Sequence, residues 1–404
     1  MDSLEGRETI WIGWSGRYSE EGEITTEVKK NVTYILVSLP KTDWDLYYNG
    51  FANSSLWPVL HYRVGLLAFD ASAFHAYKRI NQRFCDVIAH IARPEDVIWV
   101  HDYHFFMLGS LLKEYGINNR IGLFFHTPFP PASTFEILPR QMDLGHSLLQ
   151  YDLLGFQTLR DHNHFLNYAE TLGASSSGSH LTYRRQTIAT GVFPAEINSK
   201  KFADLAKEGE KKALVASLKT SLAGRKLIIG IDRLDYSKGL YERFSGYRLF
   251  LKKYPHMHRL VSYLQIAPRS RDNIAAYSDI RRQLERKAGQ INGEFADVDW
   301  APLRYLNKTE KRESLAGYLR IAQVGLVTPL RDGMNFVAKE YVAAQDPENP
   351  GVLVLSRFAG AAYQLQDALI VNPYDIEEVA DAIYQALVMP LDERKARWKQ
   401  MTSA

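Results

Sequence analysis

The stretch TPLRDGMNFVAKEY occupies residues 328–341 and directly follows the apolar run VGLV at 324–327. Apolar residues that give way to glycine and asparagine predict a buried strand that turns tightly into a helix. Asn335 suits the N-cap of that helix, and Gly333 allows the backbone to approach a ligand closely. Because parallel sheets of α/β proteins bind ligands beyond the carboxyl ends of their strands, this turn is a candidate binding site.

The same pattern recurs along the chain. Short apolar runs alternate with longer stretches of helical periodicity, such as 76–92, 104–116 and 240–253. The apolar runs lie at 32–39, 97–100, 121–125, 227–231, 260–266, 324–327, 352–355 and 368–371. Such alternation is typical of parallel sheets with helices on both faces, which places the fold in the α/β class.

The length of the chain favours more than one domain. It has 404 residues, of which 46% are hydrophobic, enough for two cores. A polar stretch from about 195 to 222 marks a boundary. We therefore predict two doubly wound domains, residues 1–200 and 201–390, followed by a helical tail at 391–404.

Charge and targeting signals narrow the class of protein. The net charge is +3 without a basic or acidic block, which predicts neither a nucleic-acid nor a membrane partner. The single Cys85 excludes an intrachain disulfide framework. The polar start lacks the pattern of a secretory signal, and no apolar run reaches the ~18 residues of a membrane helix, so we expect a cytoplasmic protein.

Two cations lie on the loop that follows the apolar run at 227–231. Arg233 and Lys238 precede a predicted helix, where free backbone amides and the helix dipole also favour an anion. This arrangement suits a diphosphate. The competing interpretation is that both are surface charges paired with Asp232 and Asp235.

Two further strand ends in the second half carry polar groups. Arg269 and Arg271 follow the run at 260–266, and Asp332 and Glu340 lie in the stretch that follows 324–327. A carboxylate repels phosphate but accepts hydrogen bonds from sugar hydroxyls, so Asp332 and Glu340 are expected to bind a sugar or ribose. Together these strand ends predict a site for an anion. The competing interpretation is that the loops only cap the helices that follow them.

The first half offers a second set of candidates at its strand ends. Asp102 follows the run at 97–100, and His126 follows the run at 121–125, so both are expected at one crevice as a hydroxyl-binding or proton-linked pair. The sequence HDYH at 101–104 suggests zinc, but no further ligand cluster follows at metal spacing. We therefore predict no metal site.

The chain resembles glycosyltransferase family 20, the family of the retaining α,α-trehalose-phosphate synthases. The resemblance extends to about residue 390, and its motifs are WIGWSG at 11–16, LDYSKGL at 234–240, SRDNIAAY at 270–277, TPLRDGMNFVAKEY at 328–341 and GVLVLSRFAGAA at 351–362. The family has the GT-B architecture, in which two Rossmann-like domains enclose an interdomain cleft. The resemblance thus implies the same layout as the strand pattern.

The resemblance implies a UDP-glucose donor. Arg233 and Lys238 would hold its diphosphate with the amides around Asn335 and Phe336, and Glu340 would bind its ribose. The implied donor-binding set also contains Asp332, Gly333, Met334 and His126. Of the donor-binding residues, the implied catalytic group is Arg233, Lys238, Asp332 and His126.

The acceptor implied by the resemblance is glucose 6-phosphate. Tyr48, Trp57 and Arg271 match the residues that bind its phosphate. The implied sugar-binding residues are Trp14, Asp102 and Gln157. Without the family, the default interpretation of Tyr48 and Trp57 is that they are ordinary core aromatics.

The chemistry implied by the resemblance needs neither a cofactor nor a covalent intermediate. Glucosyl transfer leaves a UDP anion, and cations on the diphosphate stabilise the charge that develops in the transition state. Arg233 and Lys238 would take the role that a metal fills in other transferases, so we expect no metal. The leaving phosphate would accept the proton of the acceptor hydroxyl on the same face, with retention of configuration.

The chain departs from the family pattern in several places. Family members begin with a strand that ends in Ser-Asn-Arg and a glycine-rich loop, and they end with a helix that crosses back to the first domain; both are missing from the match. We therefore expect unpaired edges in the first sheet. Glu196 stands where Gly or Ser is usual, and Gln364 where Glu is common.

These departures leave three hypotheses. The chain is an active synthase whose start codon was placed too late, a catalytically poor relative that acts as a regulatory or interaction subunit, or a relative that glucosylates another phosphorylated acceptor such as glycerol 3-phosphate. The expected partners are small molecules, UDP-glucose and glucose 6-phosphate, with a homo-oligomer possible.

Overall fold

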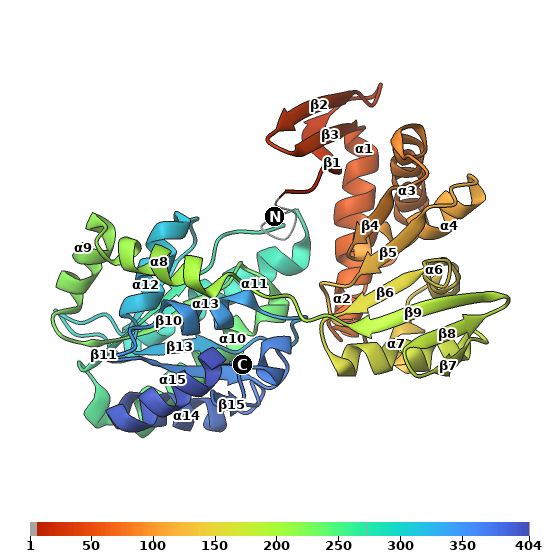
Figure 1. Cartoon of the computed structure of the whole chain (residues 1–404). Coiled ribbons are helices and arrows are strands. Elements are labelled where there is room, and N and C mark those ends of the chain that lie inside the picture. Colours follow the sequence, from red (N-terminus) through yellow and green to blue (C-terminus); the bar gives the residue numbers. More distant parts are fainter. Residues whose placement is uncertain (1–5, 272, 404) are drawn as a thin grey trace.

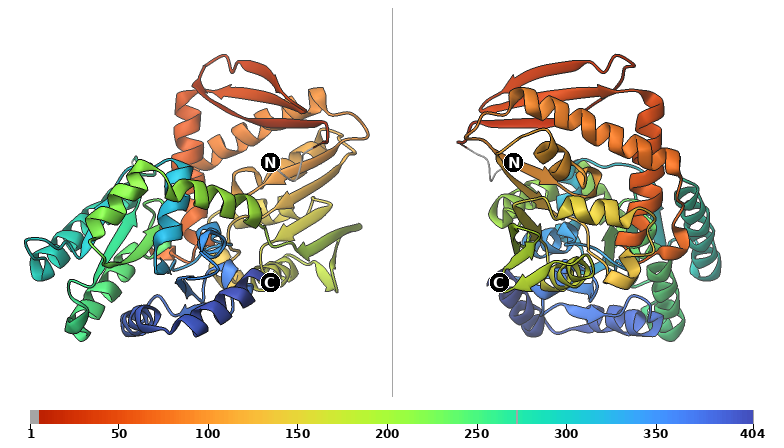
Figure 2. Two further views of the ribbon diagram at one scale, coloured as in Figure 1. Left: turned by 60° about the vertical axis from the view of Figure 1, so that its left-hand side comes forward. Right: turned by 90° about the vertical axis from the view of Figure 1, so that its right-hand side faces the viewer.

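The computed structural model describes residues 6–271 and 273–403. These residues form two halves, each built around a six-stranded sheet, and a three-stranded sheet lies at one end of the first half (Figure 1). The helix α3 (Ala71–Ile91) runs beneath the three-stranded sheet (Figure 2). The predicted α/β class is confirmed.

The sheet of the second half is parallel throughout. Its strands are β10 (Lys226–Ile231), β11 (Val261–Ile266), β12 (Leu303–Leu306), β13 (Val324–Val327), β14 (Val352–Ser356) and β15 (Leu369–Val371). They lie in the order β12-β11-β10-β13-β14-β15, so the strand order reverses between β10 and β13. In doubly wound sheets this reversal is where ligands bind, at the carboxyl ends of the strands.

Both faces of this sheet are covered. Ile228 of β10 packs into one buried apolar cluster, whereas its neighbours Leu227 and Ile229 pack into a second cluster. Because successive side chains of a strand point to opposite faces, the two clusters lie on opposite sides of the sheet. This explains why the strands of the second half read as continuous apolar runs.

The sheet of the first half is mixed. Its strands are β4 (Val97–His101), β5 (Arg120–Phe124), β6 (Leu153–Phe156), β7 (Ser175–Ser177), β8 (His180–Tyr183) and β9 (Gln186–Val192). β4, β5, β6 and β9 are parallel, but β7 and β8 run antiparallel. The four parallel strands fit the predicted layout, and β7 and β8 extend the sheet as antiparallel strands, because the short turns between β7, β8 and β9 can only join antiparallel strands.

The three-stranded sheet stands apart from the six-stranded one. It consists of β1 (Thr9–Tyr18), β2 (Ile24–Lys29) and β3 (Val32–Leu39), with β3 in the middle. Among the described strands, β1 and β4 therefore each keep one unpaired edge, as expected for the first sheet.

The remaining helices cover the sheets. They are α1 (Lys41–Trp44), α2 (Trp57–Leu60), α4 (Leu108–Glu114), α5 (Ala132–Phe135), α6 (Gln141–Leu148), α7 (Leu159–Thr171), α8 (Ser199–Glu210), α9 (Ala213–Leu222), α10 (Leu240–Lys253), α11 (Ala275–Phe295), α12 (Arg312–Ile321), α13 (Phe336–Ala344), α14 (Ile376–Val388) and α15 (Leu391–Ser403). A 12-residue π-helix, η2 (Asp45–Leu56), precedes α2. The predicted boundary at residues 200 and 201 falls in the first turn of α8, which packs on α12 and α13 of the second half.

Several predicted elements have the expected positions. All eight apolar runs are strands, and the helix expected at 240–253 is α10. The helix expected at 104–116 begins only at Leu108, because residues 103–105 form a 3₁₀ turn first. Among the described residues, no helix is both long and apolar enough to cross a bilayer.

Candidate active site

Residues 328–341 form the turn between β13 and α13 at the carboxyl edge of the second sheet. Asn335 is the N-cap of α13, with a φ of 76° and its Oδ1 accepting the Ala338 backbone N–H at 3.3 Å. The predicted cap is confirmed. The side-chain amide of Asn335 also donates to Oδ2 of Asp332 at 3.0 Å, and it thereby orients that carboxylate.

Lys238 reaches the same carboxylate from the loop after β10. It ends the short 3₁₀ helix η5 (Tyr236–Lys238), and Gly239 follows in the left-handed conformation with a φ of 64°. The Lys238 Nζ lies 2.5 Å from Oδ2 of Asp332, and both side chains are mostly buried. An anionic ligand at Lys238 therefore has to share or displace this ion pair.

The competing interpretation of the β10 loop as paired surface charges is only half right. Asp235 lies 3.4 Å from Nε of Arg233, as that interpretation expects. Asp232, however, accepts from Nη1 of the fully buried Arg243 at 2.6 Å, and Lys238 pairs with neither carboxylate.

Gly333 lies where the two halves touch. A Cβ atom on Gly333 would lie 1.9 Å from the backbone oxygen of His126, which follows β5 of the first half. A Cβ atom on Gly360 would lie 1.9 Å from the backbone oxygen of Gly333. Gly333 was expected to let the backbone approach a ligand, and the close neighbours that the structure gives it are protein backbone from both sides.

Trp57 brings together the cations of two strand ends. The guanidinium carbons of Arg271 and Arg233 lie 4.2 and 4.8 Å from the centre of its ring. Nη2 of Arg271 donates to the hydroxyl of Tyr103 at 3.0 Å. Because Trp57 and Tyr103 belong to the first half, the cations of the second half lie directly against the first half. Arg269, the other predicted arginine of this strand end, is exposed.

The rest of the predicted donor group lies on α13 and its approach. Burial raises the pKa of Glu340, whose carboxylate lies 3.6 Å from Nη2 of Arg312. Met334 is buried, and its backbone oxygen accepts from Ala361 at 2.8 Å. Phe336 is exposed at the first position of the helix.

In the first half, Asp102 and His126 follow neighbouring strands and lie close together, as predicted. Oδ1 of Asp102 accepts the backbone N–H of Thr127 at 3.3 Å. Nε2 of His126 shares a hydrogen bond of 3.0 Å with Nδ1 of His101. Burial lowers the pKa of His126, and burial together with His126 lowers the pKa of His101 to about 4. Both rings are therefore neutral near pH 7, and one of them donates to the other.

Asp102 makes the stability of the protein depend on pH. Burial raises its pKa from the ordinary value of 3.8 to about 6. The folded state thus disfavours the charged form of Asp102, which lowers the free energy of unfolding. This loss of stability is absent below about pH 4 and complete above about pH 6. An elevation of this size corresponds to about 3 kcal/mol.

Asp102→Asn should remove that cost. Asparagine tolerates the φ of 66° at this position and keeps the oxygen that accepts from Thr127. We expect the variant to be more stable than the wild type in urea at pH 7, with the gain shrinking as the pH falls to 4.5. Asp204→Asn, at an exposed position of α8, is the control and should show no such trend. An equal gain at both pH values would contradict this account of Asp102.

Two of the predicted acceptor residues, Trp14 and Tyr48, lie in a row of aromatic side chains in the first half. Trp14 of β1 lies 4.8 Å from Trp44, centre to centre, and Trp44 lies 4.8 Å from Tyr48. Tyr48 stacks on the half-buried His104 at 5.7 Å. Trp14 therefore stands two rings away from Tyr48, and the structure does not place it in the cluster around Trp57.

Gln157 and Glu196 connect the first half to the segment that leads into the second. Oε1 of Gln157 accepts the backbone N–H of Ala195 at 2.9 Å. Glu196 accepts from Nζ of Lys339 at 2.7 Å and from Nε2 of Gln364 at 2.5 Å. The two residues noted as departures from the family pattern, Glu196 and Gln364, are thus direct partners. A glutamate at 364 would put two carboxylates in contact.

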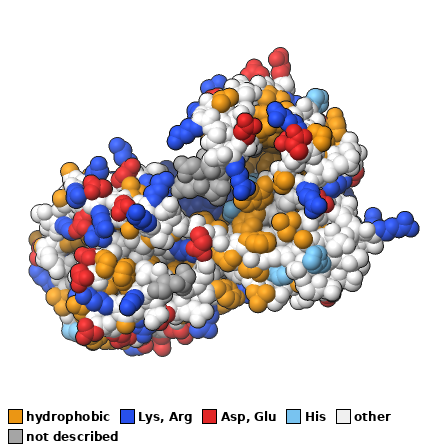
Figure 3. All heavy atoms as spheres, in the orientation of Figure 1, with side chains coloured by type: hydrophobic (Ala, Val, Ile, Leu, Met, Phe, Trp, Pro, Cys, Tyr) orange, Lys and Arg blue, Asp and Glu red, His pale blue; other side chains and the backbone are white. Residues whose placement is uncertain are grey.

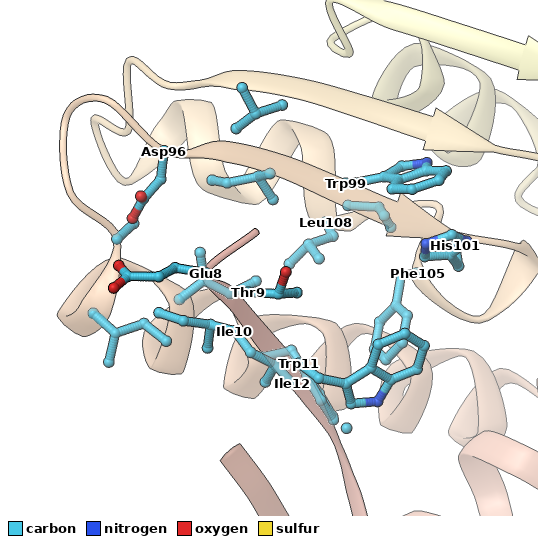
Figure 4. A pocket seen from close by; sticks show the side chains of 18 of the residues that line it. Glu8, Thr9, Ile10, Trp11, Ile12, Asp96, Trp99, His101, Phe105 and Leu108 are labelled. Atoms are coloured by element: carbon cyan, nitrogen blue, oxygen red, sulfur yellow. The ribbon is translucent and has the colours of Figure 1, made fainter. Parts of the chain in front are cut away.

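A cavity of about 700 Å³ lies between the open edges of β1 and β4. Figure 4 shows Glu8 and Asp96 at one end and Trp11 and His101 at the other, so β1 and β4 run in the same direction along its two sides. Apolar side chains gather on this face of the first half (Figure 3). Because His101 lines the cavity and contacts His126, the cavity adjoins the candidate site.

Sequence analysis did not single out every residue that lies around Trp57 and His126. The residues that it missed are Tyr103, Asp235 and Tyr277, and His101 was considered only as part of the rejected zinc candidate HDYH. Asp235 was noted only as a possible surface partner, whereas it is fully buried. Within the described part of the chain, no group of three metal-ligating side chains comes together.

Known proteins resemble this chain over its whole length. The sequence model of glycosyltransferase family 20 matches residues 1–404. The trehalose-6-phosphate synthase of Cronobacter sakazakii is 46% identical over 405 residues, covering 99% of this chain and 85% of its own length.

Solved structures also resemble this chain. An α,α-trehalose-phosphate synthase (UDP-forming) from Burkholderia xenovorans, in complex with glucose 6-phosphate, has a TM-score of 0.95 at 46% identity and covers 98% of this chain and 89% of its own. An E. coli structure bound with UDP-2-fluoro glucose has a TM-score of 0.97 at 46% identity and covers 99% and 90%. These matches confirm the predicted GT-B architecture and the resemblance. The chain belongs to glycosyltransferase family 20.

Proposed function

We propose that the protein transfers glucose from UDP-glucose to glucose 6-phosphate and releases UDP and α,α-trehalose 6-phosphate. The observation that carries this proposal is the meeting of Arg233 and Arg271 over the ring of Trp57. Two phosphate-bearing substrates need two cationic subsites side by side, and these arginines come from different strand ends. The complexes of relatives with glucose 6-phosphate and with UDP-2-fluoro glucose support the same pair of substrates.

In the proposed reaction, the bond between the glucosyl C1 and the diphosphate breaks, and a bond from C1 to the acceptor hydroxyl forms. Negative charge develops on the leaving diphosphate, where Arg233 and Lys238 stabilise it. The leaving phosphate takes the proton of the acceptor hydroxyl. The new bond forms on the face that the diphosphate leaves, so the α configuration is retained.

The proposal assigns no step to a metal or to a protein nucleophile. Asp332 is tied to Lys238 and Asn335, which leaves it suited to accept from sugar hydroxyls. A mechanism with a covalent glycosyl-enzyme intermediate needs a carboxylate nucleophile about 5 Å from a second carboxyl group that acts as the acid. The proposal gives the nucleophile role to no residue. Asp102, with its raised pKa, is bound to the backbone of Thr127 and has the role of an acceptor-binding group.

The decisive test is UDP release by this 404-residue chain with and without glucose 6-phosphate. We expect release that depends on glucose 6-phosphate, a disaccharide phosphate as product, and no loss of rate with EDTA. A parallel reaction with glycerol 3-phosphate tests the alternative acceptor. Absence of acceptor-dependent release with either compound would contradict the proposal for this chain and favour a binding or regulatory role.

Arg271→Ala should raise the KM for glucose 6-phosphate. A hydrogen bond to a charged group contributes about 1.5–3 kcal/mol, so we expect a rise of about 10- to 100-fold. UDP binding, followed by calorimetry, should change much less. Arg269→Ala removes an exposed arginine two residues away and is the matched control. Equal effects of both substitutions on KM would remove Arg271 from the acceptor site.

A further inference from the structure

Asp235 is a fully buried carboxylate in the middle of the cation cluster. Its Oδ1 accepts the backbone N–H of Ser237 at 2.9 Å and the indole N–H of Trp57 at 3.4 Å. Its Oδ2 accepts the hydroxyl of Tyr277 at 3.1 Å. One carboxylate thus holds three hydrogen-bond donors from three different elements.

The same oxygen faces both arginines. Oδ2 of Asp235 lies 3.4 Å from Nε of Arg233 and 3.5 Å from Nη1 of Arg271. Burial alone would raise the pKa of Asp235, but Arg233, Arg271 and Lys238 hold it well below its usual range, so the group stays charged. One negative charge therefore serves two arginines, since Lys238 is paired with Asp332, and the two arginines keep an excess of positive charge.

Arg271 has an unused donor. Its side chain is only 5% exposed, and its Nε is buried without a hydrogen-bond partner among the described residues. Tyr277 bridges it to Asp235, since the Tyr277 hydroxyl accepts from Nη1 of Arg271 at 2.5 Å and donates to Asp235. The arginine is thus fixed in direction, and one of its donors is left without a partner among the described residues.

We propose that Asp235 is the positioning residue that holds Arg233 and Arg271 in place against Trp57, so that one carboxylate fixes the diphosphate site of the donor and the phosphate site of the acceptor together. The assignment of these two sites rests on the proposed function, whereas the convergence on Asp235 does not. Without Asp235, the two guanidinium groups would repel each other and lose their common anchor.

This role predicts a specific response to anions. In Asp235→Asn, the buried Arg271 loses its carboxylate, so the melting temperature without anions should fall by roughly 5 °C. Added inorganic phosphate can take the place of the lost charge, and it should raise the melting temperature of this variant by more than that of the wild type. The turnover number should fall by about 100-fold, because the arginines are displaced.

Asp232→Asn is the matched control. Asp232 is also buried, but its partner Arg243 is fully enclosed and bound to Thr328 and Gln265, where no anion can reach it. The control should lose stability without recovering in phosphate. Asp235→Glu, which keeps the charge, should respond to phosphate as the wild type does.

Equal phosphate responses of Asp235→Asn and Asp232→Asn would overturn the proposal and leave Asp235 as an ordinary buried carboxylate. If Asp235→Asn does not fold, Tyr277→Phe serves instead, because it removes only the hydroxyl between Asp235 and Arg271. An unchanged KM for glucose 6-phosphate in that variant would count against the proposal, and a rise of about 5-fold would support it.

The phosphate experiment needs no turnover. A phosphate response confined to Asp235→Asn, in a protein without transferase activity, would uphold the role of Asp235 and refute the proposed function. Transferase activity, combined with equal phosphate responses of Asp235→Asn and Asp232→Asn, would uphold the proposed function and refute the role of Asp235.

Discussion

Lys238→Ala should lower the rate of glucosyl transfer by about 10²- to 10³-fold, the largest effect expected for a single side chain in this site. The Lys238 ammonium lies at the carboxyl end of β10 and at the start of α10, where it adds to the partial charge of the helix N-terminus. In the proposed reaction its charge acts on the leaving diphosphate, so the loss is expected in the turnover number. The KM for glucose 6-phosphate should stay close to that of the wild type.

Single-turnover measurements of UDP formation at saturating donor would isolate this effect. Lys238→Arg, which keeps the charge in a different geometry, should recover part of the rate. Lys253→Ala, on the exposed face of the same helix and paired with Asp381 at the surface, is the matched control and should retain full activity. An unchanged single-turnover rate in Lys238→Ala would remove this lysine from the mechanism.

Gly333→Ala should also have a large effect, although it removes no functional group. Its new methyl carbon would lie 1.9 Å from the backbone oxygen of His126, far inside van der Waals contact. The atoms nearest to this methyl carbon belong to the backbone of His126 and Thr127 and not to a flexible side chain. The turn before α13 and the segment after β5 therefore have to move apart. A displacement of about 1 Å in a site of this kind costs about 100-fold, and we expect kcat/KM to fall by that factor.

Gly289→Ala is the control for the added methyl group. Gly289 lies on the exposed side of α11, where a Cβ atom would meet nothing within 4 Å. The control should stabilise the protein by about 0.5–1 kcal/mol, because alanine is the better helix former, and it should leave the rate unchanged. Full activity in Gly333→Ala would mean that the contact between the halves at His126 is not needed for turnover.

Local chemistry made much of the second half predictable. Asn335 caps a helix because its side-chain oxygen reaches the amide of Ala338 three residues on, and such short-range geometry can be read from the order of residues. The apolar runs were visible as strands because the sheet is covered on both faces. β2 was missed for the opposite reason, since all its residues are exposed.

Contacts between distant segments could not be predicted in this way. Trp57 meets Asp235 across 178 positions of sequence, and Lys238 meets Asp332 across 94. Nothing in the local pattern distinguishes Asp235, which is buried among cations, from a surface aspartate. Trp57 likewise suits a core aromatic, which it also is, and only its two arginine neighbours point to the second role that we propose for it.

The cavity between β1 and β4 bears on how the protein behaves in storage. The cavity of about 700 Å³ is lined by residues of both strands, β1 and β4, whose edges are unpaired. Val97 and Trp99 beside it are 72% and 53% exposed. An extended apolar segment of a neighbouring molecule that has lost its fold can enter there and pair with both edges at once. The shelf life of a concentrated solution would then depend on how many unfolded molecules it contains, more than on the melting temperature of the folded ones.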